Sequence, residues 1–166
     1  KKMRIILNQG QDRRYNHILL GYNYRMTNIQ AAVGVEQLKK LNYILTEKDK
    51  IAKKYDLALK NCENIRAPYI PEYATKHAWY MYTISVNDIN RDKIVRELDG
   101  MNIETRLSFP PIHTQPFYKE KFGYTENSLP ISYEAWKKLI NIPMWAGLGE
   151  KQDYVIEKLK EICEND

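Results

Sequence analysis

Cysteine is scarce in this sequence of 166 residues, which contains only Cys62 and Cys163. The two lie far apart, and neither belongs to a CxxC pair or has a histidine at the spacing of a metal ligand. This pattern argues against a zinc site and gives no disulfide framework. It fits a protein of a reducing cytoplasm, in which thiols stay free.

Long apolar runs are also missing. No stretch approaches the roughly eighteen apolar residues that a membrane-spanning helix needs, and no signal peptide opens the chain. We therefore expect a cytoplasmic protein with no membrane partner. The chain starts at Lys1 and not at methionine, so we expect it to be a fragment of a longer protein.

Several compact catalytic motifs are absent as well. The sequence has no glycine-rich phosphate loop, no GxSxG nucleophile motif, no cluster of metal ligands and no closely spaced pair of carboxylates. These absences argue against catalysis by this chain alone, and we predict no metal site.

An excess of positive charge is present but modest, with a net charge of +5. The lysine pairs at 39–40, 53–54 and 137–138 fall within helical patterns, where a solvated helix face is the usual explanation. The charge therefore argues against nucleic acid as the main partner. A non-catalytic regulatory or nucleic-acid-binding module remains an alternative.

The most informative stretch is GYNYRMTNIQAAVGVEQLKKL, from Gly21 to Leu41. Thr27 and Gln30 have the spacing of a capping box, which predicts a helix start. Apolar residues at three- and four-residue spacing then predict one apolar helix face, formed by Ile29, Ala32, Val33, Leu38, Leu41, Ile44 and Leu45.

Asn23 and Arg25 lie just before this predicted helix start. Backbone N–H groups and the helix dipole favour an anion there, so the loop could form one wall of a phosphate or carboxylate site. The alternative is that the loop is polar and aromatic for local reasons only. The preceding connection from residue 11 to 24 is long and polar, which is typical of functional or disordered loops.

The helical pattern continues to about Leu59, and we predict a break near Asn42 or Thr46, with Thr46 capping a second segment. Apolar residues on more than one face suggest a helix that bridges two domains or two subunits. Residues 61–76 then form a crossing segment with two prolines and little periodicity.

The remainder predicts a small α/β domain. Residues 77–86 alternate as a strand with a buried face, Asn90 caps a helix that ends at Gly100, and residues 103–109 form a second strand. Further helices are expected at 117–122 and 131–139, a third strand at 141–143 and a terminal helix from residue 150. Strand, helix and strand in succession indicate a mixed sheet covered by helices on one side.

Arg106, Ser108 and His113 are the most site-like residues outside the first loop. An arginine at a strand end and a histidine just beyond Pro110 and Pro111 could face a cleft and hold a carboxylate, because guanidinium binds two oxygens at once. The alternative is a surface arginine and a histidine packed in its loop.

Four separated motifs carry a resemblance to a known family. GYNYRMTNIQAAVGVEQLKKL resembles the G-Y-N-x-R-M…AA-x-G…QL signature of the DegT/DnrJ/EryC1/StrS family of pyridoxal-phosphate-dependent sugar aminotransferases. HAWYMYTI, IETRLSFPPIHTQPFY and NIPMWAGLGEKQDYVIEKL follow in the family's order. The resemblance covers nearly the whole chain and implies the C-terminal half of a fold-type I aminotransferase.

The resemblance also implies an organisation. Residues 1–26 would be the end of the large cofactor domain and its active-site loop, residues 27–60 a long bridging helix, and residues 61–166 the small C-terminal domain. In the family, the lysine that holds the cofactor and the carboxylate at its ring nitrogen lie upstream of the matched region. We therefore expect no catalytic residue in this chain, and an inactive chain on its own.

Site residues follow from the same resemblance. The family loop reaches into the neighbouring subunit, where the asparagine matched by Asn23 binds the cofactor phosphate, so a homodimer is expected. Arg25 is the second expected cofactor residue, and Tyr22, Arg106 and His113 are expected to contact substrate. The implied activity is transfer of an amino group from glutamate to a nucleotide-linked keto sugar, in amino-sugar and polysaccharide biosynthesis. A pyridoxal-phosphate-dependent sugar dehydratase of the same family is the enzymatic alternative.

Overall fold

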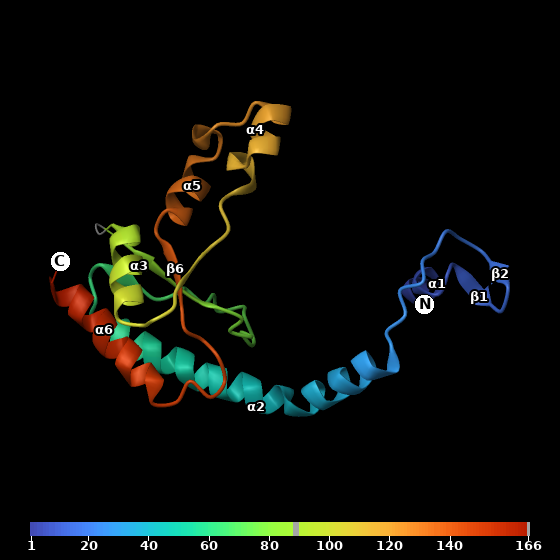
Figure 1. Ribbon diagram of the computed structural model, residues 1–166, viewed down its shortest axis with the longest axis horizontal. Helices are drawn as coiled ribbons and strands as arrows, with labels where there is room; N and C mark the ends of the chain where they lie inside the picture. The colour runs from blue at the N-terminus through green and yellow to red at the C-terminus, as the bar shows by residue number, and fades with distance from the viewer. Residues whose placement is uncertain (88–89, 166) are drawn as a thin grey trace. The chain divides into compact units, whose positions relative to one another are not determined.

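The computed structural model describes residues 1–87 and 90–165. The chain forms two compact units, Lys1–Asn42 and Tyr43–Asp166, and each is described here by itself. Helix α2, Asn28–Leu59, contributes residues to both units (Figure 1). No helix in the described ranges is long and apolar enough to cross a membrane.

The first unit begins with helix α1 (Lys2–Leu7) and a small hairpin, in which β1 (Gln11–Arg13) pairs with β2 (Asn16–His17). Part of the connection predicted as a loop over residues 11–24 is therefore paired strand. A side-chain hydrogen bond of 2.7 Å from Asn16 to Asp12 also links the two strands.

Two glycines allow the chain to pass back against itself in this unit. A Cβ atom on Gly21 would overlap the backbone nitrogen of Gly10, and a Cβ on Gly10, whose φ is +77°, would overlap the carbonyl oxygen of Leu19. Glycine is required where two backbones approach this closely. The segment after the hairpin thus returns directly along residues 5–10.

Helix α2 starts as the capping box predicts. The Thr27 amide donates to Gln30 Oε1 at 2.9 Å, and the Gln30 amide donates to Thr27 Oγ1 at 3.3 Å. The predicted break near Asn42 or Thr46 is wrong, because the helix runs through both positions without interruption. Neither residue is a proline or glycine, and lysine–carboxylate pairs at Glu47–Lys50 and Asp49–Lys53 support the turns that follow.

The second unit is built on a sheet with the strand order β3-β4-β6-β5. All three strand pairs are antiparallel, so the prediction of a mixed sheet is wrong. The strands are β3 (Ile65–Arg66), β4 (Tyr82–Val86), β5 (Arg106–Leu107) and β6 (Leu139–Ile142). The strands predicted at 77–86 and 103–109 are therefore shorter than expected. Trp79 adopts a left-handed φ of +48°, which is incompatible with an extended strand and explains the late start of β4.

One face of this sheet packs against helices. Tyr82, Ile84 and Val86 alternate as buried residues along β4. They share a core with side chains of α2, α3 (Arg91–Gly100) and α6 (Lys151–Asn165). Asn90 caps α3 as predicted, since its side chain accepts from the amides of residues 92 and 93. The predicted fold, a small α/β domain preceded by a long helix, is confirmed.

A helical segment links β5 to β6. It contains the short 3₁₀ turns Ile112–Thr114 and Glu126–Ser128 and the helices α4 (Pro116–Phe122) and α5 (Pro130–Trp136). Both helices begin with a proline, whose fixed φ suits the first helical position. Leu139, predicted to be inward on the second helix, belongs to β6 instead.

The two cysteines are joined by a disulfide bond, with their Cα atoms 6.0 Å apart. The expectation that the cysteines form no disulfide is therefore wrong, and they no longer argue for a reducing compartment. Sequence spacing alone could not reveal the pair, because it depends on α2 and α6 packing side by side.

Candidate functional site

The loop before α2 is fixed by backbone hydrogen bonds on both sides of Asn23. The Tyr22 amide donates to the Ile6 carbonyl at 2.6 Å, and the Tyr24 amide donates to the Leu7 carbonyl at 3.0 Å. Asn23 itself forms an isolated antiparallel bridge with Asn8. The backbone of the motif therefore has a defined path, set by the end of α1.

The side chains of Asn23 and Arg25 are brought together, as the sequence predicted for one wall of an anion site. Arg25 Nε donates to Asn23 Oδ1 at 3.1 Å. Both side chains are exposed. This contact uses the amide oxygen of Asn23. The NH₂ group of Asn23 and the other guanidinium N–H groups of Arg25 are left to donate to an anion. The donor set suits a phosphate or a carboxylate.

Tyr22 and Tyr24 flank Asn23 and stack on each other. Their ring centroids are 4.8 Å apart and the ring planes differ by 6°. Residues two apart in an extended segment lie on the same side, so the two rings share one side of the loop. By the same alternation, Asn23 and Arg25 lie on the opposite side of the loop, where their own contact forms.

The helix N-terminus contributes less than the sequence suggested. The capping box already uses the Gln30 N–H group, because Thr27 Oγ1 accepts from it. The Asn23 and Arg25 side chains are therefore the better candidates for direct contacts with an anion.

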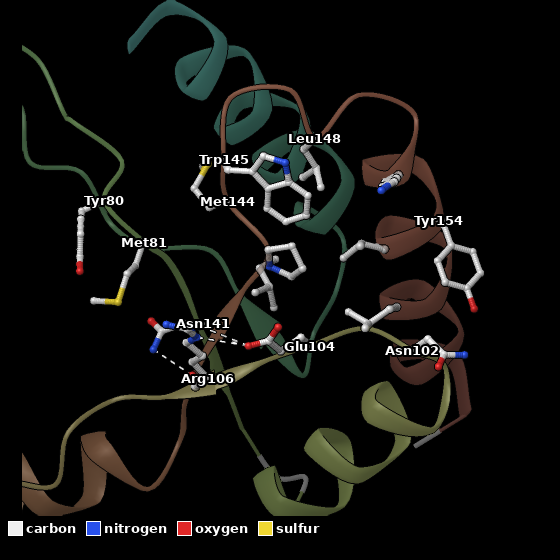
Figure 2. Close-up of a pocket in the computed structure, with 15 residues that line it drawn as sticks. Tyr80, Met81, Asn102, Glu104, Arg106, Asn141, Met144, Trp145, Leu148 and Tyr154 are labelled. Atoms are coloured by element: carbon white, nitrogen blue, oxygen red, sulfur yellow. Dashed lines mark hydrogen bonds and ion pairs between the residues drawn. The ribbon is translucent and has the colours of Figure 1, made fainter. Parts of the chain in front are cut away.

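The second unit contains an open cavity of about 670 Å³ (Figure 2). Aromatic and apolar side chains make up most of its wall, with a few polar groups among them. Its lining residues include Glu104, Arg106, Asn141 and Pro143. Its size is in the range of cavities that hold small molecules.

Arg106 lines this cavity and pairs with Glu104 across 3.4 Å. Both side chains are about four-fifths exposed, so the pair contributes little to stability. The guanidinium of Arg106 is accessible to a ligand, because its ion pair with Glu104 is weak and exposed to solvent.

Asn141 is buried beside the cavity and was not singled out from the sequence. Its Oδ1 accepts from Thr83 Oγ1 at 2.6 Å and its Nδ2 donates to the Arg106 carbonyl at 2.9 Å. These bonds join β4, β6 and β5 and fix the backbone that carries Arg106. The sequence signal that could have identified Asn141 is that it is a single polar residue within a short apolar strand.

His113 lies apart from the residues that line the cavity and is 4% exposed. Its Nε2 atom is buried, and no partner for it is recorded among the described residues. No recorded contact joins His113 to Arg106. The joint binding of a carboxylate by these two residues stays a prediction.

Two buried tyrosines stiffen the domain behind the cavity. Tyr55 donates to the Pro143 carbonyl at 3.0 Å, and Tyr82 donates to Asp56 Oδ1 at 2.6 Å. Burial raises the pKa of both hydroxyls above the ordinary value, and the hydrogen bond to Asp56 raises the pKa of Tyr82 further. Both hydroxyls therefore remain protonated and hold their acceptors at neutral pH.

The model of the DegT/DnrJ/EryC1/StrS aminotransferase family matches residues 1–160. The chain belongs to this family. The match includes the loop at Asn23 and the strands around Arg106, so the resemblance inferred from the motifs is confirmed.

Similar proteins include a named synthase and an uncharacterized protein. The chain is 33% identical over 168 residues to a GDP-perosamine synthase of Caulobacter vibrioides, covering 97% of this chain and 44% of that protein. It is 35% identical over 157 residues to the uncharacterized protein MJ1066 of Methanocaldococcus jannaschii, covering 91% of this chain and 40% of that protein. The chain thus spans less than half the length of these relatives.

Solved structures of family members have the same fold. DesV from S. venezuelae superposes with a TM-score of 0.88 at 26% identity, covering 99% of this chain and 44% of that chain. A DegT/DnrJ/EryC1/StrS aminotransferase from Brucella abortus gives a TM-score of 0.82 at 28% identity, covering 97% and 42%.

Proposed function

We propose that this chain is the C-terminal part of a pyridoxal-phosphate-dependent aminotransferase that acts on a nucleotide-linked keto sugar, with glutamate as amino donor. The observation that carries the proposal is the family match across residues 1–160. The similarity to GDP-perosamine synthases supports a nucleotide-sugar substrate. The similarity to the spore coat polysaccharide biosynthesis protein SpsC of Bacillus subtilis supports a role in polysaccharide biosynthesis.

Asn23 and Arg25 are the proposed contacts to the cofactor phosphate. The free NH₂ of Asn23 donates to a phosphate oxygen, while Arg25 holds the amide through its Oδ1 and adds positive charge. A hydrogen bond to a charged group contributes roughly 1.5 to 3 kcal/mol. The donor chemistry therefore fits the group.

Bound pyridoxal phosphate supplies an electron sink for amino transfer. The lysine that would hold it and move the proton is proposed to lie in the part of the protein outside this chain. Residues of this chain bind and orient: Asn23 and Arg25 fix the phosphate end, and the stacked Tyr22 shields one side of the loop.

Arg106, His113 and Tyr22 are the proposed substrate contacts. The exposed guanidinium of Arg106 at the cavity suits a carboxylate or a phosphate oxygen. His113 is proposed from the family resemblance alone, because its Nε2 is buried in this structure.

A homodimer completes the proposal, with Asn23 serving the cofactor site of the neighbouring subunit. Its support is the apolar face at the start of α2, which is exposed in this chain. Ile29 is 80%, Val33 58% and Leu38 69% exposed. A contiguous exposed apolar surface of this kind is typical of protein interfaces.

The test is replacement of Asn23 by alanine in the full-length protein, with the cofactor dissociation constant measured from its visible absorbance. We expect Asn23→Ala to weaken binding by roughly 10- to 150-fold, since one charge-assisted hydrogen bond is lost. Asn42→Ala, on the exposed face of α2, is the control and should bind as the unchanged protein does. Equal affinity of both variants would refute the role of Asn23.

The reaction itself is tested by incubating the full-length protein with glutamate and a nucleotide-linked keto sugar. Nitrogen transfer from labelled glutamate to the sugar, followed by mass spectrometry, supports an aminotransferase. Loss of water from the sugar without nitrogen transfer would favour the dehydratase alternative.

A further inference from the structure

Helices α2 and α6 run side by side in the same direction, and they are fastened at both ends of their contact (Figure 1). At the start of α6, Gln152 Nε2 donates to the Ile51 carbonyl at 2.7 Å, in a buried position. At the end of α6, Cys163 is bonded to Cys62. Both contacts join residues 101 positions apart, as parallel helices in constant register require.

The two ends differ in how they are held. The start of α6 also has an ion pair of 2.6 Å between Asp153 and Lys54. From the middle of α6 onward, the recorded ion pairs of Lys158 are with Glu157 and Glu161 of the same helix. Among the described residues, the end of α6 is held to the rest of the domain by the apolar packing of Leu159 and Ile162 and by the disulfide.

The cysteine pair is placed for reversible oxidation. Cys62 lies just after the end of α2, and both cysteines are half-buried, so small reagents have access to them. Their Cα separation of 6.0 Å is in the normal range for a disulfide. The chain has no other cysteine, so no competing pairing exists within it.

We propose that Cys62 and Cys163 form an oxidative modification site that clamps the end of α6 to α2, with a low-molecular-weight disulfide such as oxidised glutathione as oxidant. The thiolate of one cysteine attacks the oxidant, forms a mixed disulfide and releases one thiol. The other cysteine's thiolate then attacks the protein sulfur of the mixed disulfide and releases the second thiol. Two electrons pass to the oxidant, and the two cysteine protons end on the released thiols.

Closing the bond stabilises the fold mainly by restricting the unfolded chain, and the effect grows with the separation of the bonded residues. A separation of 101 residues is large, so the oxidised form gains stability. Reduction leaves the end of α6 held by Leu159 and Ile162 alone, and helix ends without other contacts fray. The state of the bond therefore sets the order of the C-terminal turns.

The experiment compares the full protein equilibrated with oxidised glutathione and with dithiothreitol. Intact mass after alkylation should show no label on Cys62 and Cys163 in the oxidised protein and two labels after reduction. The thermal midpoint of the small domain should fall by about 10 °C on reduction. Cys62→Ser and Cys163→Ser should each have the lower midpoint and lose the response to glutathione.

A local measurement separates the clamp from a general loss of stability. Hydrogen exchange in the last two turns of α6 should rise on reduction, while exchange near Gln152 stays unchanged. Alkylation of both cysteines after glutathione treatment would overturn the proposal. An unchanged midpoint and unchanged exchange on reduction would overturn it as well. Neither result depends on aminotransferase activity, so the proposed function is tested separately.

Discussion

The two units of this chain differ in what they bury. Every buried apolar side chain of the core lies at residue 51 or beyond, within the second unit. The first unit, all of whose residues the structure describes, has no fully buried large apolar residue, and many of them are exposed, including Leu20 at 82% and Ile29 at 80%. Yet the clearest sequence signature, from Gly21 to Leu41, lies in this poorly buried unit. The buried core thus lies in one unit and the loop that carries Asn23 in the other.

Core truncation should expose this difference most strongly. Ile84 is fully buried on β4, whereas Val33 on α2 is 58% exposed. We expect Ile84→Ala to lower the free energy of unfolding of the chain by about 2–5 kcal/mol, since it leaves a cavity. Val33→Ala should change it by less than about 0.5 kcal/mol. Urea unfolding followed by circular dichroism measures both, and similar losses would break the distinction.

Glycine replacement probes the backbone of the first unit. Gly21→Ala should disrupt the return of the chain, because the new Cβ meets the Gly10 backbone, and we expect a cost of about 1–3 kcal/mol. Gly34→Ala is the matched control within α2, where a Cβ meets nothing within 4 Å. It should stabilise the helix by about 1 kcal/mol. Hydrogen exchange of the Tyr22 and Tyr24 amides reports the first effect.

Alkaline pH should act on the second unit through its buried tyrosines. The pKa values of Tyr55 and Tyr82 are raised by burial above the ordinary value of 10.0. Their contribution to stability is complete below pH 10 and is lost as the pH rises further, because the unfolded chain releases these protons first. Tyr55→Phe should reduce the loss between pH 10 and 12. An identical pH profile for the variant would contradict the assignment.

The smallest expected effect concerns the start of α2. Thr27→Ala removes a cap and should raise amide exchange at Gln30 about fivefold, for a cost of about 1 kcal/mol. Thr46→Ala lies within the uninterrupted helix and should leave exchange at its neighbours unchanged. If Thr46→Ala raised amide exchange at its neighbours as much as Thr27→Ala raises it at Gln30, a second helix would start near Thr46.

Local signals in the sequence were reliable where the partner groups lie close in the chain. The capping box of Thr27 and Gln30 and the cap at Asn90 depend on contacts three residues away or less, and both are present. The family signature likewise identified the fold, because its motifs are contiguous segments.

Features that depend on distant contacts could not be predicted. Trp79 is buried and has a left-handed backbone that the local pattern does not signal, so the strand pattern of residues 77–81 was misleading. The disulfide needed the parallel packing of α2 and α6. Asn141 acquires its role only when β4 and β5 flank β6.

The most direct test of the central claim is a subunit-mixing experiment on the full-length protein. An Asn23→Ala variant is mixed with a variant that lacks the cofactor-holding lysine, and cofactor dissociation is followed in the exchanged dimers. If Asn23 serves the neighbouring subunit, mixed dimers contain one complete site, and slow dissociation returns in part. Fast dissociation from every mixed dimer would mean that Asn23 acts within its own subunit, and would contradict the account.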